Sequence, residues 1–216
     1  THSTPHAVVI ALHTKYGIVL YTNDFKFDLS PTLGKKPNLK RLKELGKEGV
    51  YALFIDSTYA PDPRKMPSES IAKEKLRDVL LNTDSKNKGI IITTFSSHIA
   101  RLNSIVEFGK KLRRKIIFMG RSLSKYTKAA ENAGIINFSK DVEICKYSKQ
   151  IKRRLKKIEN EREKYLLVVT GHQGEPKSTL YKIATKEFKY RMNPQDHVIF
   201  SSRVIPTPTN IENSEK

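Results

Sequence analysis

Short apolar runs rich in β-branched residues recur along the chain and alternate with stretches of helical period. Each run has about the length of one strand, and an unbroken apolar run of that length is typical of a strand buried on both faces. The runs span residues 7–12, 17–21, 51–55, 89–95, 115–119, 165–170 and 197–202. The alternation predicts an α/β fold with a mostly parallel sheet flanked by helices.

The segments between the runs refine this prediction. Residues 13–16 separate the first two runs, a length that suits a β-hairpin. Apolar residues recur at helical spacing over residues 99–112, 123–133 and 151–158, so we expect helices there. Pro63, Pro67 and two serines in residues 62–70 predict a loop at a domain boundary, followed by a helix near residues 68–81.

The charge balance indicates an anionic partner. The 216 residues carry 41 Lys and Arg against 22 Asp and Glu, a net charge of +19, which is typical of nucleic-acid binding. The alternative to nucleic-acid binding is that the positive charge only keeps the protein soluble. A lone cysteine, Cys145, excludes a disulfide framework and a multi-cysteine zinc module. No run approaches the roughly 20 residues that span a bilayer, so we expect a soluble, cytoplasmic protein with no membrane partner.

Polar turns follow three of the predicted strands. Ligands of parallel sheets bind outside the carboxyl ends of the strands, and the helix starts found there attract phosphate. We therefore expect these turns to bind a phosphate backbone, although each alone could be a simple cap or turn. Ser97 and Ser122 are candidate helix caps, and Pro176 suits the first helical position. The turns comprise Ser96, Ser97, His98 and Arg101, then Arg121 and Ser122, then residues 171–175.

Acidic residues and a histidine gather at the front of the chain. His2 stands near the start, Asp24 and Asp28 follow the second apolar run, and Asp56 follows the third. A histidine with carboxylates suits Zn²⁺ or Mn²⁺. The alternative is that an aspartate after a strand serves only as a turn or cap residue.

The ordered set of these motifs resembles the metallo-β-lactamase/β-CASP nucleases, and most of all ribonuclease J of the archaeal type. The resemblance covers nearly the whole chain and rests on residues 2–5, 22–28, 56–58, 93–101, 120–122, 170–175 and 199–202. It implies part of an αββα metallo-β-lactamase domain over residues 1–58 and a β-CASP domain over residues 59–196. Residues 197–216 would then be a return strand to the first domain and a tail.

The resemblance also implies an activity. The family hydrolyses RNA phosphodiesters with a water activated by two Zn²⁺ or Mn²⁺ ions, and we expect 5′ to 3′ exonuclease action on single-stranded RNA with a 5′ monophosphate. His2 matches a metal ligand, Asp24 the carboxylate that bridges the metals, and Asp56 an acid that supports the catalytic site. The complete enzyme is expected to be a homo-oligomer. The matching RNA-binding residues are Ser96, Ser97, His98, Arg101, Arg121, Ser122, Gly171, His172, Gln173, Gly174, Glu175, Ser201 and Ser202.

The chain departs from the family pattern at the metal ligands. The H-x-H-x-D-H cluster is absent, no two of the six histidines stand two residues apart, and the chain opens on Thr1 instead of Met. We expect a portion of an enzyme that needs a complementing polypeptide segment to close an incomplete metal site. The alternative is a catalytically silent RNA-binding module. Pre-mRNA cleavage endonucleases and DNA-repair nucleases share the architecture, but residues 171–175 favour ribonuclease J.

Overall fold

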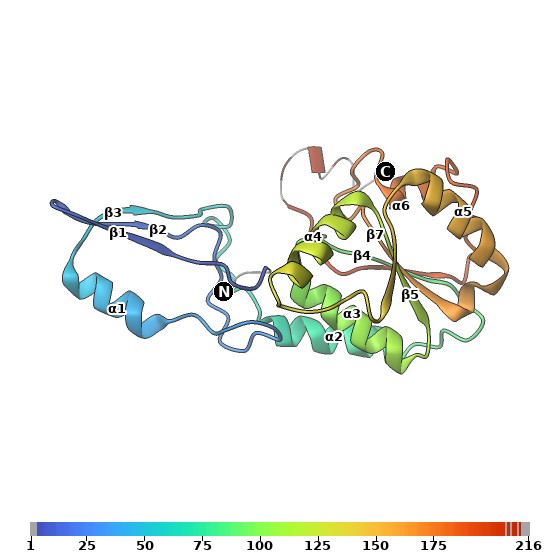
Figure 1. The fold of residues 1–216 in the computed structure, drawn as a ribbon, viewed down its shortest axis with the longest axis horizontal. Coiled ribbons are helices and arrows are strands. Elements are labelled where there is room, and N and C mark those ends of the chain that lie inside the picture. Colours follow the sequence, from blue (N-terminus) through green and yellow to red (C-terminus); the bar gives the residue numbers. More distant parts are fainter. Residues whose placement is uncertain (1–3, 206, 208, 211, 213–216) are drawn as a thin grey trace. The chain divides into compact units, whose positions relative to one another are not determined.

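A computed structural model describes residues 4–205, 207, 209–210 and 212. The chain divides into two compact units, Thr1–Lys73 (unit 1) and Glu74–Lys216 (unit 2), each with its own sheet. Figure 1 labels the elements. In chain order they are β1 (Ile10–Thr14), β2 (Gly17–Tyr21), α1 (Leu39–Glu48), β3 (Val50–Phe54), α2 (Glu69–Leu81), β4 (Ile90–Thr93), α3 (Ile99–Lys111), β5 (Lys115–Met119), α4 (Arg121–Asn132), β6 (Val142–Cys145), α5 (Ser148–Ile158), the 3₁₀ helix η1 (Glu159–Lys164), β7 (Tyr165–Val169), α6 (Thr179–Ala184) and β8 (His197–Phe200).

Unit 1 contains a three-stranded sheet in the order β1-β2-β3. β1 and β2 pair in antiparallel fashion, which confirms the expected hairpin, and β3 joins β2 in parallel. The small core consists of Ile18 and Leu20 of β2 with Leu45 of α1. Sequence reasoning missed α1, a charged helix in which the Asn38 side chain accepts a hydrogen bond from the backbone N–H of Arg41. Whether this unit is part of a metallo-β-lactamase domain stays a prediction.

The Asp28 carboxylate fastens the start of α2 within unit 1. It accepts hydrogen bonds from the Ser68 hydroxyl at 2.6 Å, the Glu69 backbone N–H at 2.7 Å and the Ser30 backbone N–H at 2.9 Å. Burial acts to raise the pKa of Asp28, but these hydrogen bonds and the charge of Lys26 outweigh it and hold the pKa below its usual value. Asp28, considered above as a possible cation ligand, is thus a helix-capping residue with its oxygens occupied.

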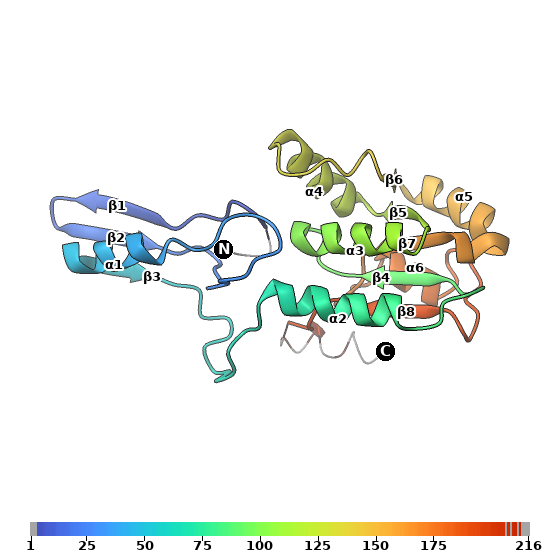
Figure 2. The same ribbon diagram turned by 90° about the horizontal axis from the view of Figure 1, so that it is seen from below.

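Unit 2 confirms the predicted α/β architecture. Its five strands lie in the order β6-β5-β7-β4-β8 and all pair in parallel. Side chains alternate between the two faces, so Ile117 and Leu167 pack with residues of α5 and α6 on one face. Gly109 of α3 approaches Ile116 and Leu166 on the other face. Figure 2 shows α3 and α4 together along that second face.

The amino edge of this sheet is closed by buried charge. Arg162 forms an ion pair of 2.6 Å with Asp196, whose side chain is 1% exposed and which also accepts the Gly89 backbone N–H. Arg114 donates to the backbone carbonyls of Ser85 and Tyr165. These contacts satisfy backbone groups where the strands begin, because the sheet itself offers them no partner there.

Several boundaries differ from the sequence expectations. β6 was missed, since Glu143 interrupts its short apolar run. The strand His197–Phe200, expected to lead back to the first domain, pairs instead with β4 in this sheet. The helix expected to begin at Pro176 begins at Thr179, because the Ser178 side chain caps it by accepting the Tyr181 backbone N–H. In the part of the chain described, no helix is both long and apolar enough to cross a bilayer.

Replacing Asp28 with alanine is expected to destabilise unit 1 by about 2–4 kcal/mol, since several charge-assisted hydrogen bonds at a helix start are lost. The carboxylate's contribution is present above its unfolded-state pKa and is lost as the pH falls through its lowered folded-state pKa. Urea unfolding followed by circular dichroism measures the change. Asp78→Ala is the matched control, because that carboxylate is 53% exposed on the same helix. Equal effects of the two substitutions would contradict the capping role.

Candidate nucleic-acid interface

Four parallel strands of unit 2 end side by side at one edge of the sheet. Thr93, the last residue of β4, is paired with Val169 of β7 and with Phe200 of β8. Met119, the last residue of β5, is also paired with Val169. The turns after these strands therefore meet at one edge, and most of the candidate RNA-binding residues lie there.

Arg101 joins two of these strand ends. Its Nη1 atom donates to the backbone carbonyl of Ser201 at 2.7 Å and to the Ser201 hydroxyl at 2.8 Å. The Thr94 hydroxyl donates to the same carbonyl, and the Ser201 backbone N–H donates to Thr93. The guanidinium thus fixes the end of β8 against the end of β4, with Ser201 buried.

The turns after β4 and β5 also touch. The hydroxyls of Ser96 and Ser122 lie 3.0 Å apart and form a hydrogen bond. The expectation that Ser97 and Ser122 cap their helices is wrong, because His98 and Gly120 occupy the N-cap positions. Gly120 has φ +144°, and a Cβ there would lie 3.0 Å from the Thr170 side chain, so only glycine lets the strand turn directly into α4.

The loop of residues 171–175 is held tightly. Gly171 has φ +124°, and a Cβ at this position would lie 2.6 Å from the Ser178 hydroxyl oxygen, so a side chain would displace the loop. The Gln173 side chain donates to the Arg203 carbonyl at 2.9 Å and accepts the Ile205 backbone N–H at 2.7 Å. Gln173 therefore clamps the segment that follows β8, a role that the sequence did not reveal.

His172 is the buried member of this loop. Its ring packs edge-on against Phe95 at 3.9 Å between centroids, and its Nδ1 atom lies 3.8 Å from a Glu175 carboxylate oxygen. Burial lowers the pKa of His172, and the Glu175 charge opposes this only in part. Within the described residues, neither ring nitrogen has a hydrogen-bond partner, and the same holds for the buried hydroxyl of Ser202. His172 is therefore a neutral imidazole with unused polar atoms at neutral pH.

A cavity of about 710 Å³ opens beside these turns. Exposed Arg121 and Ser122 line it, together with basic residues that sequence reasoning did not select: Lys125, Lys146, Lys177 and Lys182. Lys125 lies in α4, Lys146 precedes α5, Lys177 precedes α6 and Lys182 lies in the last turn of α6, so no local run of charge identified them. Only the topology of the sheet brings them together.

The candidate catalytic acids belong to unit 1. Asp24 and Asp56 follow the neighbouring parallel strands β2 and β3, where Tyr21 is paired with Phe54. Both acids are exposed, and Asp56 accepts hydrogen bonds from the backbone N–H and the hydroxyl of Thr58. His2 lies outside the described residues. Within those residues, no group of three His, Cys, Asp or Glu side chains is placed to hold a metal ion.

Comparison with known proteins gives a consistent result. Residues 87–214 match the family model "Ribonuclease J, beta-CASP domain". The chain is 44% identical over 211 residues to Ribonuclease J of Pyrococcus abyssi, covering 98% of this chain and 46% of the relative. It is 41% identical over 211 residues to Ribonuclease J of Methanocaldococcus jannaschii, covering 97% and 47% of the two chains. The chain thus spans about half the length of these curated relatives.

Stability of unit 2 should depend on the protonation of His172. Its folded-state pKa lies below the unfolded value near 6.5, so between the two values the unfolded chain binds more protons. Stability is therefore present above pH 6.5 and is lost as the pH falls below it. We expect the free energy of unfolding, measured with urea at pH 7 and pH 5, to fall more in the wild type than in His172→Gln. Identical pH dependence in both proteins would rule this out, and His13→Gln controls for the removal of an exposed imidazole.

Proposed function

Because the chain belongs to the ribonuclease J family, we propose that it binds single-stranded RNA as part of a metal-dependent nuclease that hydrolyses RNA phosphodiesters. The proposal includes 5′ to 3′ exonuclease action and a preference for a 5′ monophosphate, both implied by the resemblance of the motifs. Homo-oligomer formation by the complete enzyme stays a prediction.

The observation that carries the proposal is the polar, cationic carboxyl edge of the sheet in unit 2. Turns from β4, β5, β7 and β8 meet there through direct hydrogen bonds, and the chain has a net charge of +19. Phosphate contacts by lysine and arginine supply most of the sequence-independent affinity for nucleic acid. A preformed edge holds the backbone of the substrate without paying for loop ordering at each encounter.

The metal ions need ligands beyond those described here. Asp24 and Asp56 are exposed carboxylates that follow β2 and β3, and the described residues hold no cluster of three metal-ligating side chains. The residues present therefore do not fit a complete two-metal site, and we derive no catalytic step from them. We propose that Asp24 joins ligands from a further polypeptide segment, with Asp56 supporting it.

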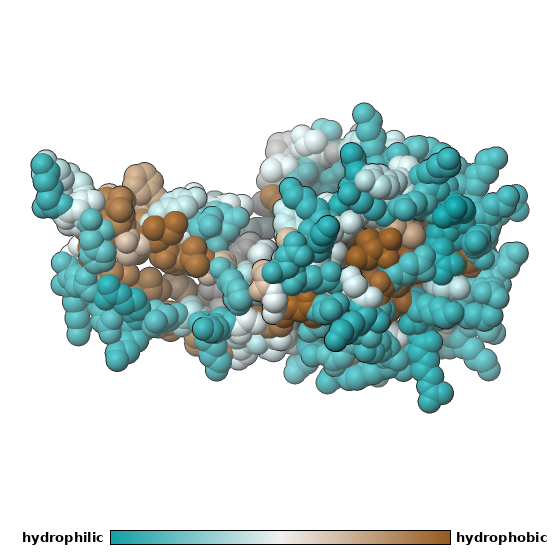
Figure 3. Space-filling model, in the orientation of Figure 1, coloured by the Kyte–Doolittle hydropathy of each residue, from teal (hydrophilic) through white to brown (hydrophobic). Residues whose placement is uncertain are grey.

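The sheet of unit 1 offers a surface for such a segment. Ile10, Tyr21 and Phe54 form a cross-strand row on the face opposite Leu45, and each is about half exposed or more, at 51%, 49% and 59%. Figure 3 shows apolar residues gathered on the surface of this unit. Exposed apolar faces of this kind are usually covered by another layer of structure. We assign it to a part of the longer family polypeptide, since the archaeal relatives are about twice as long.

A catalytically silent RNA-binding module is the second candidate. The observation that favours it is the separation of roles along the chain: the cationic edge lies in unit 2, whereas Asp24 and Asp56 lie in unit 1. RNA binding alone does not distinguish the two candidates. Hydrolysis by the completed assembly does.

The chain alone should bind single-stranded RNA with strong salt dependence. Fluorescence anisotropy with a labelled 5′-monophosphorylated oligonucleotide should give log K against log salt with a slope of about −2 or steeper, as expected for three or more phosphate contacts. Affinity that is insensitive to salt would contradict a phosphate-contact mechanism. The same oligonucleotide with a 5′ hydroxyl tests end recognition, and equal affinity for both would remove that element of the proposal.

Adding the remaining segments of a family polypeptide should restore metal-dependent RNA hydrolysis. Asp24→Asn should abolish hydrolysis by the assembly, because the carboxylate proposed to help hold the metal would be replaced by a neutral amide, while RNA affinity changes by less than about twofold. Gel analysis of end-labelled RNA and anisotropy measure the two quantities.

Controls separate assembly from chemistry. Phe54→Asp should prevent assembly by placing a charge on the apolar row, whereas Tyr16→Asp, at a 70% exposed hairpin position, should not. An assembly that forms and binds metal yet leaves RNA intact would favour the silent binding module.

A further inference from the structure

The lysine-lined cavity at the carboxyl edge differs from the cluster around Arg101 and Ser201. It lies where β5, β6 and β7 end, and Arg121, Lys125 and Lys146 line it. The Arg101 cluster lies where β4 and β8 end. The volume of about 710 Å³ falls within the range of small-ligand sites.

The cavity has the charge of an anion site. Among the described residues that line it, none is Asp or Glu. Lys182 pairs with Glu187 at 3.2 Å, whereas Arg121, Lys125, Lys146 and Lys177 form no ion pair with any described residue. Uncompensated cations around a concave surface raise the local concentration of anions and bind phosphate oxygens.

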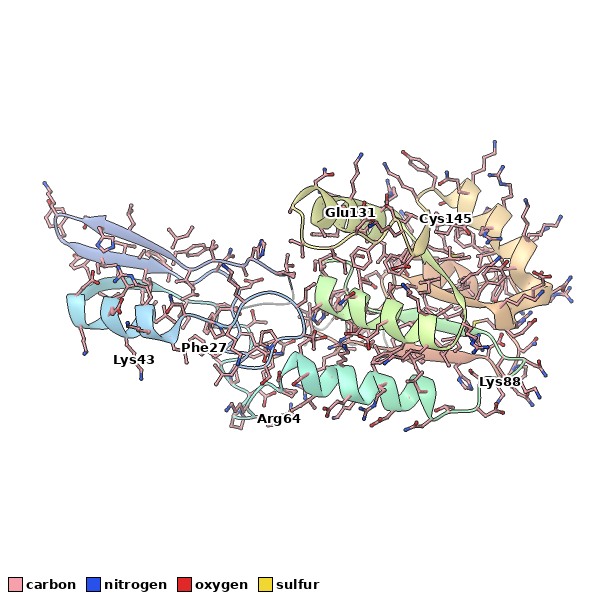
Figure 4. All side chains as sticks on the ribbon, turned by 60° about the horizontal axis from the view of Figure 1, so that its bottom comes forward. Phe27, Lys43, Arg64, Lys88, Glu131 and Cys145 are labelled. Carbon is pink, nitrogen blue, oxygen red and sulfur yellow. The ribbon has the colours of Figure 1, made fainter. Side chains whose placement is uncertain are left out.

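An aromatic ring stands at the rim of this cavity. Tyr147, the N-cap residue of α5, is 53% exposed, and the Lys146 ammonium lies 5.0 Å from the centre of its ring. The Gln150 side chain accepts the backbone N–H groups of both residues at 3.1 Å, so the backbone is held in place at both positions. An exposed tyrosine beside cations is suited to stack on a nucleobase. Figure 4 shows nitrogen-tipped side chains projecting from the region of α5, next to the labelled Cys145 at the end of β6.

Lys177 contributes a separate observation. Its backbone has φ +67°, a left-handed conformation that disfavours most side chains. Glycine or asparagine adopts this conformation more readily, yet the position holds a long cation that lines the cavity. Arg113 and Lys186 adopt the same conformation, so the assignment of Lys177 rests on its place in the lining of the cavity.

The position of the cavity favours a polymer over a free nucleotide. Only β7 and β4 lie between β5 and β8 in the sheet order β6-β5-β7-β4-β8. Neighbouring strands are roughly 4.8 Å apart, so the cavity and the Arg101 cluster are adjacent parts of one edge. A single extended strand can contact both.

We propose that this cavity is a second RNA-binding site, which takes one nucleotide unit of a single strand, with its base on Tyr147 and its phosphates on Lys125, Lys146 and Lys177. The inference rests on the proposed function and deepens it by assigning a base-stacking position and phosphate contacts outside the residues that the family motifs indicate.

The double variant Lys125→Gln/Lys146→Gln of the full chain tests the charges. Its affinity for labelled oligouridylate should fall at least about tenfold at 100 mM salt, and the slope of log K against log salt should become shallower by about 1.4. Lys128→Gln/Lys140→Gln is the matched control, since it removes the same charge at exposed positions outside the cavity. Equal effects of the two pairs would overturn the site.

The stacking contact has its own test. Tyr147→Ala should weaken binding at least about fivefold and Tyr147→Phe should restore it, whereas Tyr126→Ala, exposed on α4, should change affinity less than twofold. Lys177→Asn should lower affinity without lowering the melting temperature, because asparagine tolerates the left-handed backbone. Unchanged RNA affinity in folded Lys177→Asn would overturn the assignment of Lys177.

The outcomes separate this inference from the proposed function. No RNA binding by the wild type at any salt concentration would refute the proposed function itself. Salt-dependent binding that is indifferent to both the lysine pair and Tyr147 would refute only the second site. Adenosine monophosphate serves as the competitor. If substituting these residues weakened the binding of adenosine monophosphate but left RNA affinity unchanged, the cavity would be assigned to a free nucleotide and the RNA site would be overturned.

Discussion

Parallel pairing of all five strands is the constraint on which unit 2 depends. It places every strand's carboxyl end at one edge and every amino end at the other, so all the turns at one edge follow strands and all those at the other edge precede them. The amino edge is closed by Arg114 and by the buried Arg162–Asp196 ion pair. The carboxyl edge is left to turns of Gly, Ser, Gln and cationic residues. The difference between the two edges therefore begins with strand direction and does not depend on any single residue.

Sequence periodicity was sufficient for most of this architecture. The apolar runs identified the strands buried on both faces, because all five residues of β7 and the last four residues of β5 lie inside. Periodicity missed two elements whose own sequences show no clear apolar pattern. α1 is too charged to stand out and relies on Asn38 and a few leucines, while β6 gains its place from pairing with β5 and not from its own sequence.

The candidate site was predictable in part. The turns after the strands were found because the carboxyl ends of parallel strands must meet, and the family motifs marked them. The contacts within the site were not predictable. Nothing local indicates that Gln173 holds the backbone at residues 203 and 205, or that Asp28 reaches the start of α2, 41 residues away. Such bonds join positions remote in the chain, so only the folded topology reveals them.

The lysines of the cavity carry little of the packing: Lys125, Lys146 and Lys177 are all exposed. Each sits on its own segment, and replacing one leaves the strands and the core untouched. Under the proposed function, the affinity for RNA can therefore change in small, independent steps during evolution, one amine at a time, while the fold stays constant.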